Sequence, residues 1–176
     1  MTLISWLRFQ WNLTTSELAG EIPAPFQIRS ATAEEETFVH QVVNSSFSID
    51  GSWADAWKSL KLNIEQGITD CFEQKAGDCL VITHGTRIIG TSVLDPDPSA
   101  ENNLLTGPCI LHEYRSRGLG SLLLRESLKR LKEKGLEKAY GLTRERTMAA
   151  RFVYRKFAGV SAPYESGPEL AARLTI

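Results

Sequence analysis

Between residues 115 and 121 the chain reads Arg-Ser-Arg-Gly-Leu-Gly-Ser, a short run that combines two glycines with two arginines. It follows an apolar stretch, residues 104–111, that is typical of a buried strand, and it precedes leucines at helical spacing. Glycine permits backbone angles and close approaches that a Cβ forbids, and the first turn of a helix leaves N–H groups without partners. The loop is therefore predicted to bind an anion such as phosphate, with the arginines adding positive charge.

The spacing of the glycines separates three kinds of phosphate-binding loop. A P-loop would end in Gly-Lys-Ser or Gly-Lys-Thr, which is absent, and a dinucleotide-binding G-x-G-x-x-G would need glycine where Leu123 stands. The pattern that remains is R-x-x-G-x-G, from Arg115 to Gly120. For these six residues alone, an ordinary strand-to-helix turn with solvated arginines is the alternative.

This R-x-x-G-x-G pattern resembles the acyl-CoA pyrophosphate loop of the GNAT superfamily of N-acyltransferases. Residues 109–115 are similar to the end of the family's preceding strand, and residues 150–159 are similar to its last helix. The resemblance spans about residues 26–164. It implies an α/β fold in a single domain, with a mixed, largely antiparallel central sheet flanked by helices.

Three positions depart from the family's pattern. His112 stands where proline is frequent, Thr147 stands where an asparagine is often found, and Ala158 stands where the glycine after the last helix usually falls. Because of the last two, a catalytically weak CoA-binding or protein-interaction module of the same fold remains an alternative to an active enzyme.

The resemblance implies roles for the backbone and for one tyrosine. Amides at the end of the strand would face the acyl group and the pantetheine arm, and amides of the loop would grip the pyrophosphate. Tyr154 matches the family's tyrosine that protonates the departing CoA thiolate, a transfer that a phenol of pKa about 10 can make; its alternative is a half-buried packing role. The predicted cofactor-binding residues are Ile110, Leu111, His112, Arg115, Ser116, Arg117, Gly118, Leu119, Gly120, Ser121 and Thr147.

The base that deprotonates the amine is left open. An alkylammonium of pKa near 10.4 is a free base in only about one molecule per few thousand at pH 7, so something must accept its proton. Glu113, His112, Asp95 and Glu101 are the candidates, and Glu113 is also expected to orient Arg115.

Composition limits the remaining alternatives. The 176 residues suit one domain, which we divide into an N-terminal extension, residues 1–25, and an acetyltransferase-like domain, residues 26–176. No apolar run is long enough to span a membrane and no signal peptide is evident, so we expect a cytoplasmic protein without a membrane partner. The three cysteines, Cys71, Cys79 and Cys109, are too few and too irregular for disulfides or a zinc site, and no metal is expected.

Charge is distributed unevenly along the chain. Residues 1–112 carry six Lys and Arg against fourteen Asp and Glu, a balance of −8, whereas residues 113–156 carry thirteen against five, a balance of +8. A basic segment that begins at the glycine loop suits a polyanionic cofactor such as CoA. Glutamates interrupt the basic helix at salt-bridging spacings, so nucleic acid is not expected as a partner.

The other elements are predicted from periodicity and turn residues. A capping box at Thr32 and Glu35 begins a helix that reaches about residue 47. A second helix carries Trp53 and Trp57 on an apolar stripe that is usually core, but in the layout that the resemblance implies either tryptophan could wall the amine pocket. The N-terminal segment fits a short helix or a strand equally well. The predicted ranges are strands at 26–29, 79–83, 87–94, 104–111, 138–142 and 160–163, helices at 32–47, 52–66, 119–134 and 147–157, and a closing strand at 169–176.

These observations predict an N-acetyltransferase that moves an acyl group from acetyl-CoA, its cosubstrate, to a primary amine. The acceptor, a small molecule or a peptide amine, is not identified by charge totals, and the acyl group could be acetyl or longer. The oligomeric state also stays open, with a homodimer as one alternative.

Overall fold

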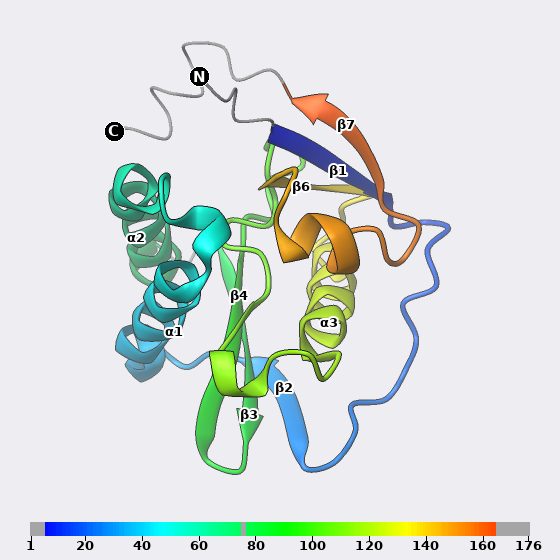
Figure 1. Ribbon diagram of the computed structural model, residues 1–176. Coiled ribbons are helices and arrows are strands. Elements are labelled where there is room, and N and C mark those ends of the chain that lie inside the picture. Colours follow the sequence, from blue (N-terminus) through cyan, green and yellow to red (C-terminus); the bar gives the residue numbers. More distant parts are fainter. Residues whose placement is uncertain (1–5, 75–76, 165–176) are drawn as a thin grey trace.

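The computed structural model describes residues 6–74 and 77–164 of the chain (Figure 1). Its antiparallel sheets flanked by helices confirm the predicted α/β fold. Along the chain the elements are β1 (Trp6–Asn12), β2 (Phe26–Ser30), η1 (Ala33–Glu35), α1 (Glu36–Ile49), η2 (Gly51–Trp53), α2 (Trp57–Gln74), β3 (Asp78–His84), β4 (Arg87–Leu94), β5 (Cys109–Ile110), η3 (His112–Tyr114), α3 (Leu119–Glu133), β6 (Lys138–Arg144), η4 (Ala149–Val153) and β7 (Val160–Tyr164).

The described strands form two sheets, ordered β6-β1-β7 and β2-β3-β4-β5, and each of these neighbouring strands pairs antiparallel. The two strands that flank α3 in the sequence, β5 and β6, lie in different sheets, because β6 pairs antiparallel with β1. The predicted strand 104–111 is too long, since β5 contains only two residues. Gly107 has a φ of 63° and Pro108 follows it, so the backbone turns and a ladder donor is lost just before β5.

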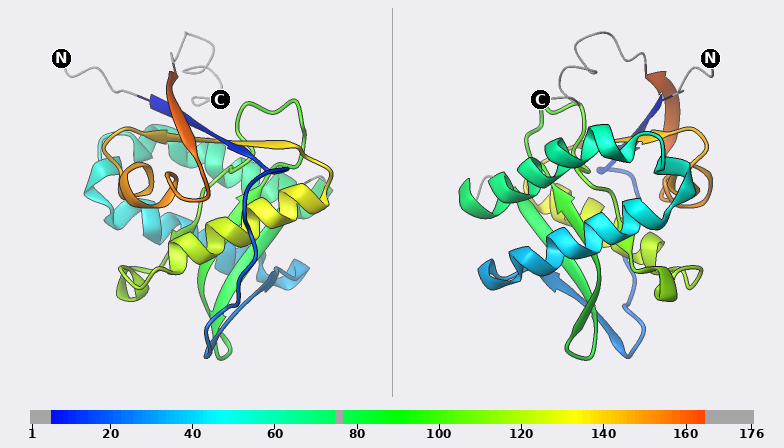
Figure 2. Two further views of the ribbon diagram at one scale, coloured as in Figure 1. Left: turned by 90° about the vertical axis from the view of Figure 1, so that its right-hand side faces the viewer. Right: turned by 60° about the vertical axis from the view of Figure 1, so that its left-hand side comes forward.

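The sheet that contains β3 and β4 is buried on both faces. Figure 2 shows α1 and α2 side by side on one face and α3 on the other. Because side chains alternate along a strand, successive apolar residues of β3 and β4 enter two different clusters. Val81 and Val93 pack with α1 and α2, whereas Leu80, Ile82 and Ile89 pack with the first turns of α3.

Helix α3 joins the two sheets. Leu119 and Leu123 pack on the β3 and β4 side, while Leu124, Leu128 and Leu131 enter the cluster that contains β1 and β6. All five leucines are 2% exposed or less, so α3 is fixed from two directions and its first turn has a defined position.

Strand β1 is the centre of the smaller sheet. It pairs with β6 on one side and β7 on the other, and its Phe9 and Trp11 are fully buried. The sequence left this segment open between helix and strand, and the structure makes it a strand. It lies before the boundary predicted at residue 25, which stays a prediction.

Two predicted helices have different bounds in the structure. The second helix begins at Trp57 rather than at residue 52, because Asp50 caps the separate turn η2 before it. It also extends further than predicted, to Gln74. The helix predicted at residues 147–157 is only the π-helical turn η4, in which the Tyr154 N–H donates to the Ala149 carbonyl. Within residues 6–74 and 77–164, no helix is both long and apolar enough to cross a membrane. The closing strand predicted at residues 169–176 lies outside the described residues.

Candidate active site

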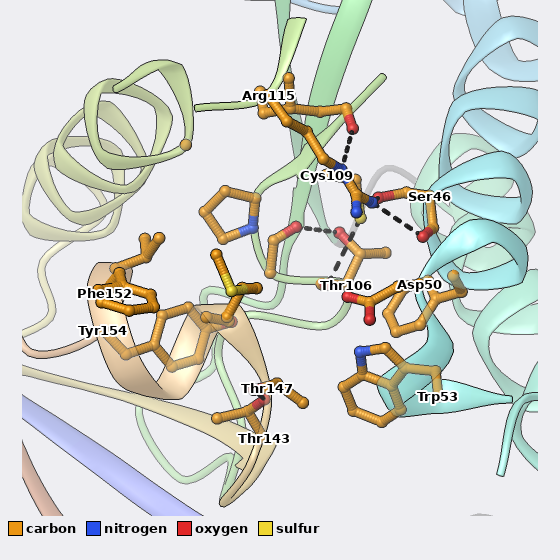
Figure 3. Close-up of a pocket in the computed structure, with 18 of the residues that line it drawn as sticks. Ser46, Asp50, Trp53, Thr106, Cys109, Arg115, Thr143, Thr147, Phe152 and Tyr154 are labelled. Carbon is orange, nitrogen blue, oxygen red and sulfur yellow. Dashed lines mark hydrogen bonds between the residues drawn. The ribbon is translucent and has the colours of Figure 1, made fainter. Parts of the chain in front are cut away.

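A single pocket of about 670 Å³ runs from the glycine loop to the space between η2 and β1 (Figure 3). Its walls come from the end of α1 and η2, the segment 102–110, the first turn of α3, and η4. Ten of the twelve site residues predicted from sequence line it: Ile110, His112, Arg115, Ser116, Gly118, Leu119, Gly120, Ser121, Thr147 and Tyr154. The other two, Leu111 and Arg117, do not: the Leu111 side chain packs in the core, and the Arg117 side chain lies over the Tyr114 ring.

The glycine loop presents free backbone donors to this pocket. Gly118 is the N-cap residue of α3 with a φ of 76°, a left-handed conformation that glycine adopts without steric cost. No described residue accepts a hydrogen bond from the N–H groups of residues 118–121, and the first bond of the helix is Leu122 N–H to the Gly118 carbonyl. Free N–H groups at the positive end of a helix dipole are suited to bind an anion.

Gly120 keeps this end of the pocket open. A Cβ built on Gly120 would lie 3.8 Å from Cγ2 of Val153 on η4, which is an ordinary contact distance. Alanine would therefore fit, whereas a larger side chain would extend across the space between the first turn of α3 and η4.

Arg115 faces the protein rather than the loop. Its Nη2 donates to the Ser46 carbonyl at 3.0 Å and to Ser46 Oγ at 3.1 Å, and its Nε donates to the Ile110 carbonyl at 3.2 Å. Arg115 thereby ties the loop to the C-terminal end of α1, where unpaired carbonyls favour a cation.

The predicted pairing of Glu113 with Arg115 is wrong. Glu113 forms an ion pair with Arg87 at 2.7 Å. The pKa of the Glu113 carboxyl is held below its usual range first by a hydrogen bond from its own backbone N–H and then by the pairing with Arg87. Glu113, Asp95 and Glu101 do not line the pocket, so His112 is the one predicted base candidate that does.

Tyr154 lies at the wall formed by residues 104–108. Its side chain is 3% exposed, and it packs edge-on against Phe9 and Trp11 with ring centroids 5.5 Å apart in each case. A Cβ on Gly107 would come within 2.2 Å of the Tyr154 hydroxyl, so that hydroxyl lies directly against the Gly107 backbone. It forms no hydrogen bond with any residue in the described ranges. Burial raises the pKa of Tyr154 above its ordinary value, which keeps the phenol protonated.

Thr147 has a local structural role. Its Oγ1 donates to the Arg144 carbonyl, accepts from the Ala150 N–H, and bonds to Thr143 Oγ1, all within 3.1 Å. This hydroxyl begins the π-helical turn and so positions Tyr154 seven residues later.

The far end of the pocket was not predicted as a unit. Trp6 of β1, Phe47 of α1 and Trp53 of η2 line it together with the carboxylate of Asp50. Of the two tryptophans considered for the wall of the amine pocket, Trp53 lines this pocket, whereas Trp57 stacks on Phe47 outside the lining; the role in amine binding stays a prediction. Trp6 and Asp50 carried no signal beyond an aromatic-rich segment and an Asp-x-Ser turn.

Cys109 lines the same pocket, but its environment disfavours the thiolate. Burial raises the pKa of its thiol to about 12, so the reactive thiolate is scarce near neutral pH. All three cysteines are free and buried.

Solved structures of other proteins share this fold. An acetyltransferase from the GNAT family of Colwellia psychrerythraea superposes with a TM-score of 0.65 at 15% identity, over 91% of this chain and 53% of that one. GCN5-related N-acetyltransferases from Sphaerobacter thermophilus and Kribbella flavida give TM-scores of 0.58 and 0.55, at 17% and 16% identity, over 91% and 95% of this chain. The chain spans 49% and 60% of the length of those two structures.

These likenesses show the fold. A comparison with curated proteins finds no match. The model of the acetyltransferase (GNAT) family matches residues 37–160, which is more than half of the chain. The chain therefore belongs to the acetyltransferase (GNAT) family.

Proposed function

We propose that this protein transfers an acyl group from acyl-CoA to a primary amine, and that the acyl group is acetyl. The observation that carries the proposal is one continuous pocket, which has free N–H groups of α3 at one end and the Tyr154 hydroxyl along its wall. General acyl transfer agrees with membership of the family.

The glycine-loop end suits the pyrophosphate of CoA. The free N–H groups of residues 118–121 would bind its oxygens, and the net positive charge of residues 113–156 would favour a polyanion. Arg115, with its guanidinium engaged by Ser46 and Ile110, would hold the loop in place rather than wrap around a phosphate.

The middle of the pocket suits the thioester. The His112 N–H donates to no residue within the described ranges, and it lies just beyond β5 on the lining. An unpaired N–H at this point could stabilise negative charge on the thioester oxygen as the amine attacks. Because this donor is a backbone group, the His112 side chain is available for another role, such as accepting the proton of the amine.

The reaction balances as follows. The ammonium of the acceptor loses a proton to solvent, either directly or through His112, and its nitrogen then attacks the thioester carbonyl carbon. The C–S bond breaks, and the sulfur takes its electron pair and a proton from the Tyr154 hydroxyl. The nitrogen loses its second proton, which restores the phenol. The products are an amide, free CoA thiol and one proton.

A thiol-release assay tests the proposal. Purified protein is given acetyl-CoA and a panel of primary amines, and free thiol is followed with a chromogenic disulfide against reactions without amine. We expect amine-dependent thiol release, together with an acetylated product by mass spectrometry. Tight CoA binding without release for any amine would instead favour the alternative, a CoA-binding module without catalysis.

A further inference from the structure

Three aromatic side chains surround the end of the pocket opposite the glycine loop. The Phe47 and Trp53 rings lie 5.0 Å apart at 71°, and the Trp6 and Trp53 rings lie 5.9 Å apart at 57°. The three come from α1, η2 and β1, so the fold brings them together from distant parts of the chain. The apolar side chains Leu60, Ile64 and Leu105 extend the same wall.

Asp50 is the one acidic side chain in the lining of this pocket among the described residues. Its Oδ1 accepts hydrogen bonds from the Ser52 N–H at 3.0 Å and from Ser52 Oγ at 2.6 Å. Its Oδ2 has no donor, and Asp50 forms no ion pair, within residues 6–74 and 77–164. Figure 3 shows the carboxylate directed into the cavity beside Trp53, across from Tyr154.

An unpaired carboxylate among aromatic rings is a recognition element for one kind of ligand. Aromatic faces attract a cation, and a carboxylate with a free oxygen forms a charge-assisted hydrogen bond with an ammonium. The rings also bury the apolar part of a ligand, since each removes a large area from water.

We infer that the acceptor is a primary amine with a single positive charge on an apolar, ring-bearing body, whose ammonium binds Asp50 and whose body packs among Trp6, Phe47 and Trp53. This inference rests on the proposed function and narrows its acceptor. It assigns Asp50 to binding and orientation of the amine, while the proton leaves by the route given above.

Charge excludes polycationic acceptors from this end of the pocket. A polyamine or an aminoglycoside carries several ammonium groups, and each would need an acceptor when removed from water. The lining offers one carboxylate, and its other fully charged side chains, Arg115 and Lys156, are cations. A second ammonium would therefore have no carboxylate acceptor in the described lining and would be repelled by these two cations.

The wall is fixed before any ligand arrives. Arg144 of β6 donates to the Ser52 carbonyl at 2.8 Å and pairs with Asp55 at 2.7 Å, which ties η2 to the smaller sheet. A preformed site loses little conformational entropy when it binds a small ligand.

The chain also contains a matched control for Asp50. Asp97 accepts from the Ser99 N–H at 2.8 Å and from Ser99 Oγ at 2.7 Å, the same turn that Asp50 makes with Ser52, but Asp97 lies outside the pocket lining. Asparagine at either position keeps the Oδ1 acceptor and removes the charge. The pair Asp50→Asn and Asp97→Asn therefore separates charge in the pocket from the shared turn.

Binding of phenethylamine, measured by calorimetry and by quenching of tryptophan fluorescence, tests the inference. We expect phenethylamine to bind at least about tenfold more tightly than the neutral phenethyl alcohol and than spermidine. Asp50→Asn should remove about the same factor, and Asp97→Asn should remove none. In the thiol-release assay the loss in Asp50→Asn should raise KM more than it lowers kcat.

Equal binding of the amine and the alcohol would overturn the inference without any variant. It would also be overturned if spermidine or a lysine peptide bound more tightly than phenethylamine, or if Asp50→Asn bound it within twofold of the parent. These titrations are made without CoA, whereas the proposed function is judged by acetyl-CoA binding and thiol release. Failure of one is therefore distinguishable from failure of the other.

Discussion

One end of the pocket is formed by backbone groups, and the other end is formed by side chains. At the glycine loop the donors are N–H groups of four consecutive residues, 118–121, held by one helix. At the other end the surface consists of side chains from β1, α1 and η2 that meet only through tertiary packing. A backbone site depends on glycines at a few positions, whereas a side-chain site changes with every substitution. The first kind suits a ligand common to a family, and the second suits an acceptor particular to one chain.

Tyr154 stands between the two ends, and replacing it should have the largest effect. Tyr154→Phe keeps the ring packed on Phe9 and Trp11 and removes only the hydroxyl. We expect kcat to fall by about 10² to 10⁴ if the hydroxyl is the general acid. Affinity for acetyl-CoA should stay within a few fold, and the melting temperature should barely change. A kcat within about threefold of the parent would make Tyr154 structural.

The pH profile of the parent sharpens this prediction. Burial raises the pKa of Tyr154, so the acid form persists beyond the usual phenol value of about 10. Activity should therefore show no loss from this group up to pH 10, and the decline should begin only above it. A decline centred well below pH 10 that disappears in Tyr154→Phe would contradict the burial seen here.

A branched side chain at residue 120 should block the glycine-loop end of the pocket. Gly120→Val should abolish the stabilisation by acetyl-CoA, which for the parent is about 2.7 kcal/mol at a hundred times the dissociation constant. Gly67 provides the control, because a Cβ there would lie 3.9 Å from Leu105 Cδ1, compared with 3.8 Å from Val153 Cγ2 at Gly120. Gly67→Val introduces the same side chain into a helix at a similar contact distance, and it should still respond to acetyl-CoA. A normal acetyl-CoA shift in folded Gly120→Val would mean that the loop is only a turn.

Cys109, which lines the pocket, leads to a prediction about the stability of the fold at alkaline pH. The pKa of its thiol is about 12 in the folded protein and about 8.5 when unfolded, so the unfolded chain releases its proton first. Stability from this group is complete below pH 8.5 and is lost as the pH rises toward 12. Denaturant unfolding between pH 8 and 11 should show that the free energy of unfolding falls less steeply with pH in Cys109→Ser than in the parent. The difference in slope should be up to about 1.4 kcal/mol per pH unit. An unchanged slope would place the thiol in contact with water.

The smallest effect is expected away from the pocket. Glu35 completes the capping box of η1 by accepting from the Thr32 N–H, and it accepts two hydrogen bonds of 2.7 and 2.9 Å from Arg29, a pairing that lowers its pKa to about 2. Because the folded pKa is depressed, the contribution is present above the unfolded pKa and is lost as the pH falls toward 2. Glu35→Gln should cost about 1 kcal/mol or less at pH 7, with no change in kcat or KM. A change in KM would show that α1 transmits strain to Phe47.

Sequence alone predicted the backbone end of this pocket and not the side-chain end, for a physical reason. The glycines and the helical leucines after them encode a local conformation, which is written in consecutive residues. Trp6 lies on β1, whereas Asp50 and Trp53 belong to the turn η2 more than forty residues later, and their proximity to Trp6 depends on where β1 inserts between β6 and β7. Nothing local to residues 6–12 specifies that insertion.

The other incorrect predictions of secondary structure have local backbone causes that the hydrophobic pattern does not reveal. The strand predicted at 104–111 is interrupted by the positive φ of Gly107 and by Pro108, although the apolar run continues through them. The helix predicted at 147–157 closes as a π-turn because Tyr154 N–H bonds five residues back. Both irregularities lie on the pocket wall, where the Tyr154 hydroxyl meets Gly107.

The central claim is that the free amides of the glycine loop bind the pyrophosphate of an acyl-CoA, and calorimetric titration with acetyl-CoA tests it most directly. The parent should bind acetyl-CoA with a one-to-one stoichiometry and show no heat with NAD, and Gly120→Val should show no heat with either. No binding of acetyl-CoA at millimolar concentration, or equal binding of acetyl-CoA by parent and Gly120→Val, would contradict the account.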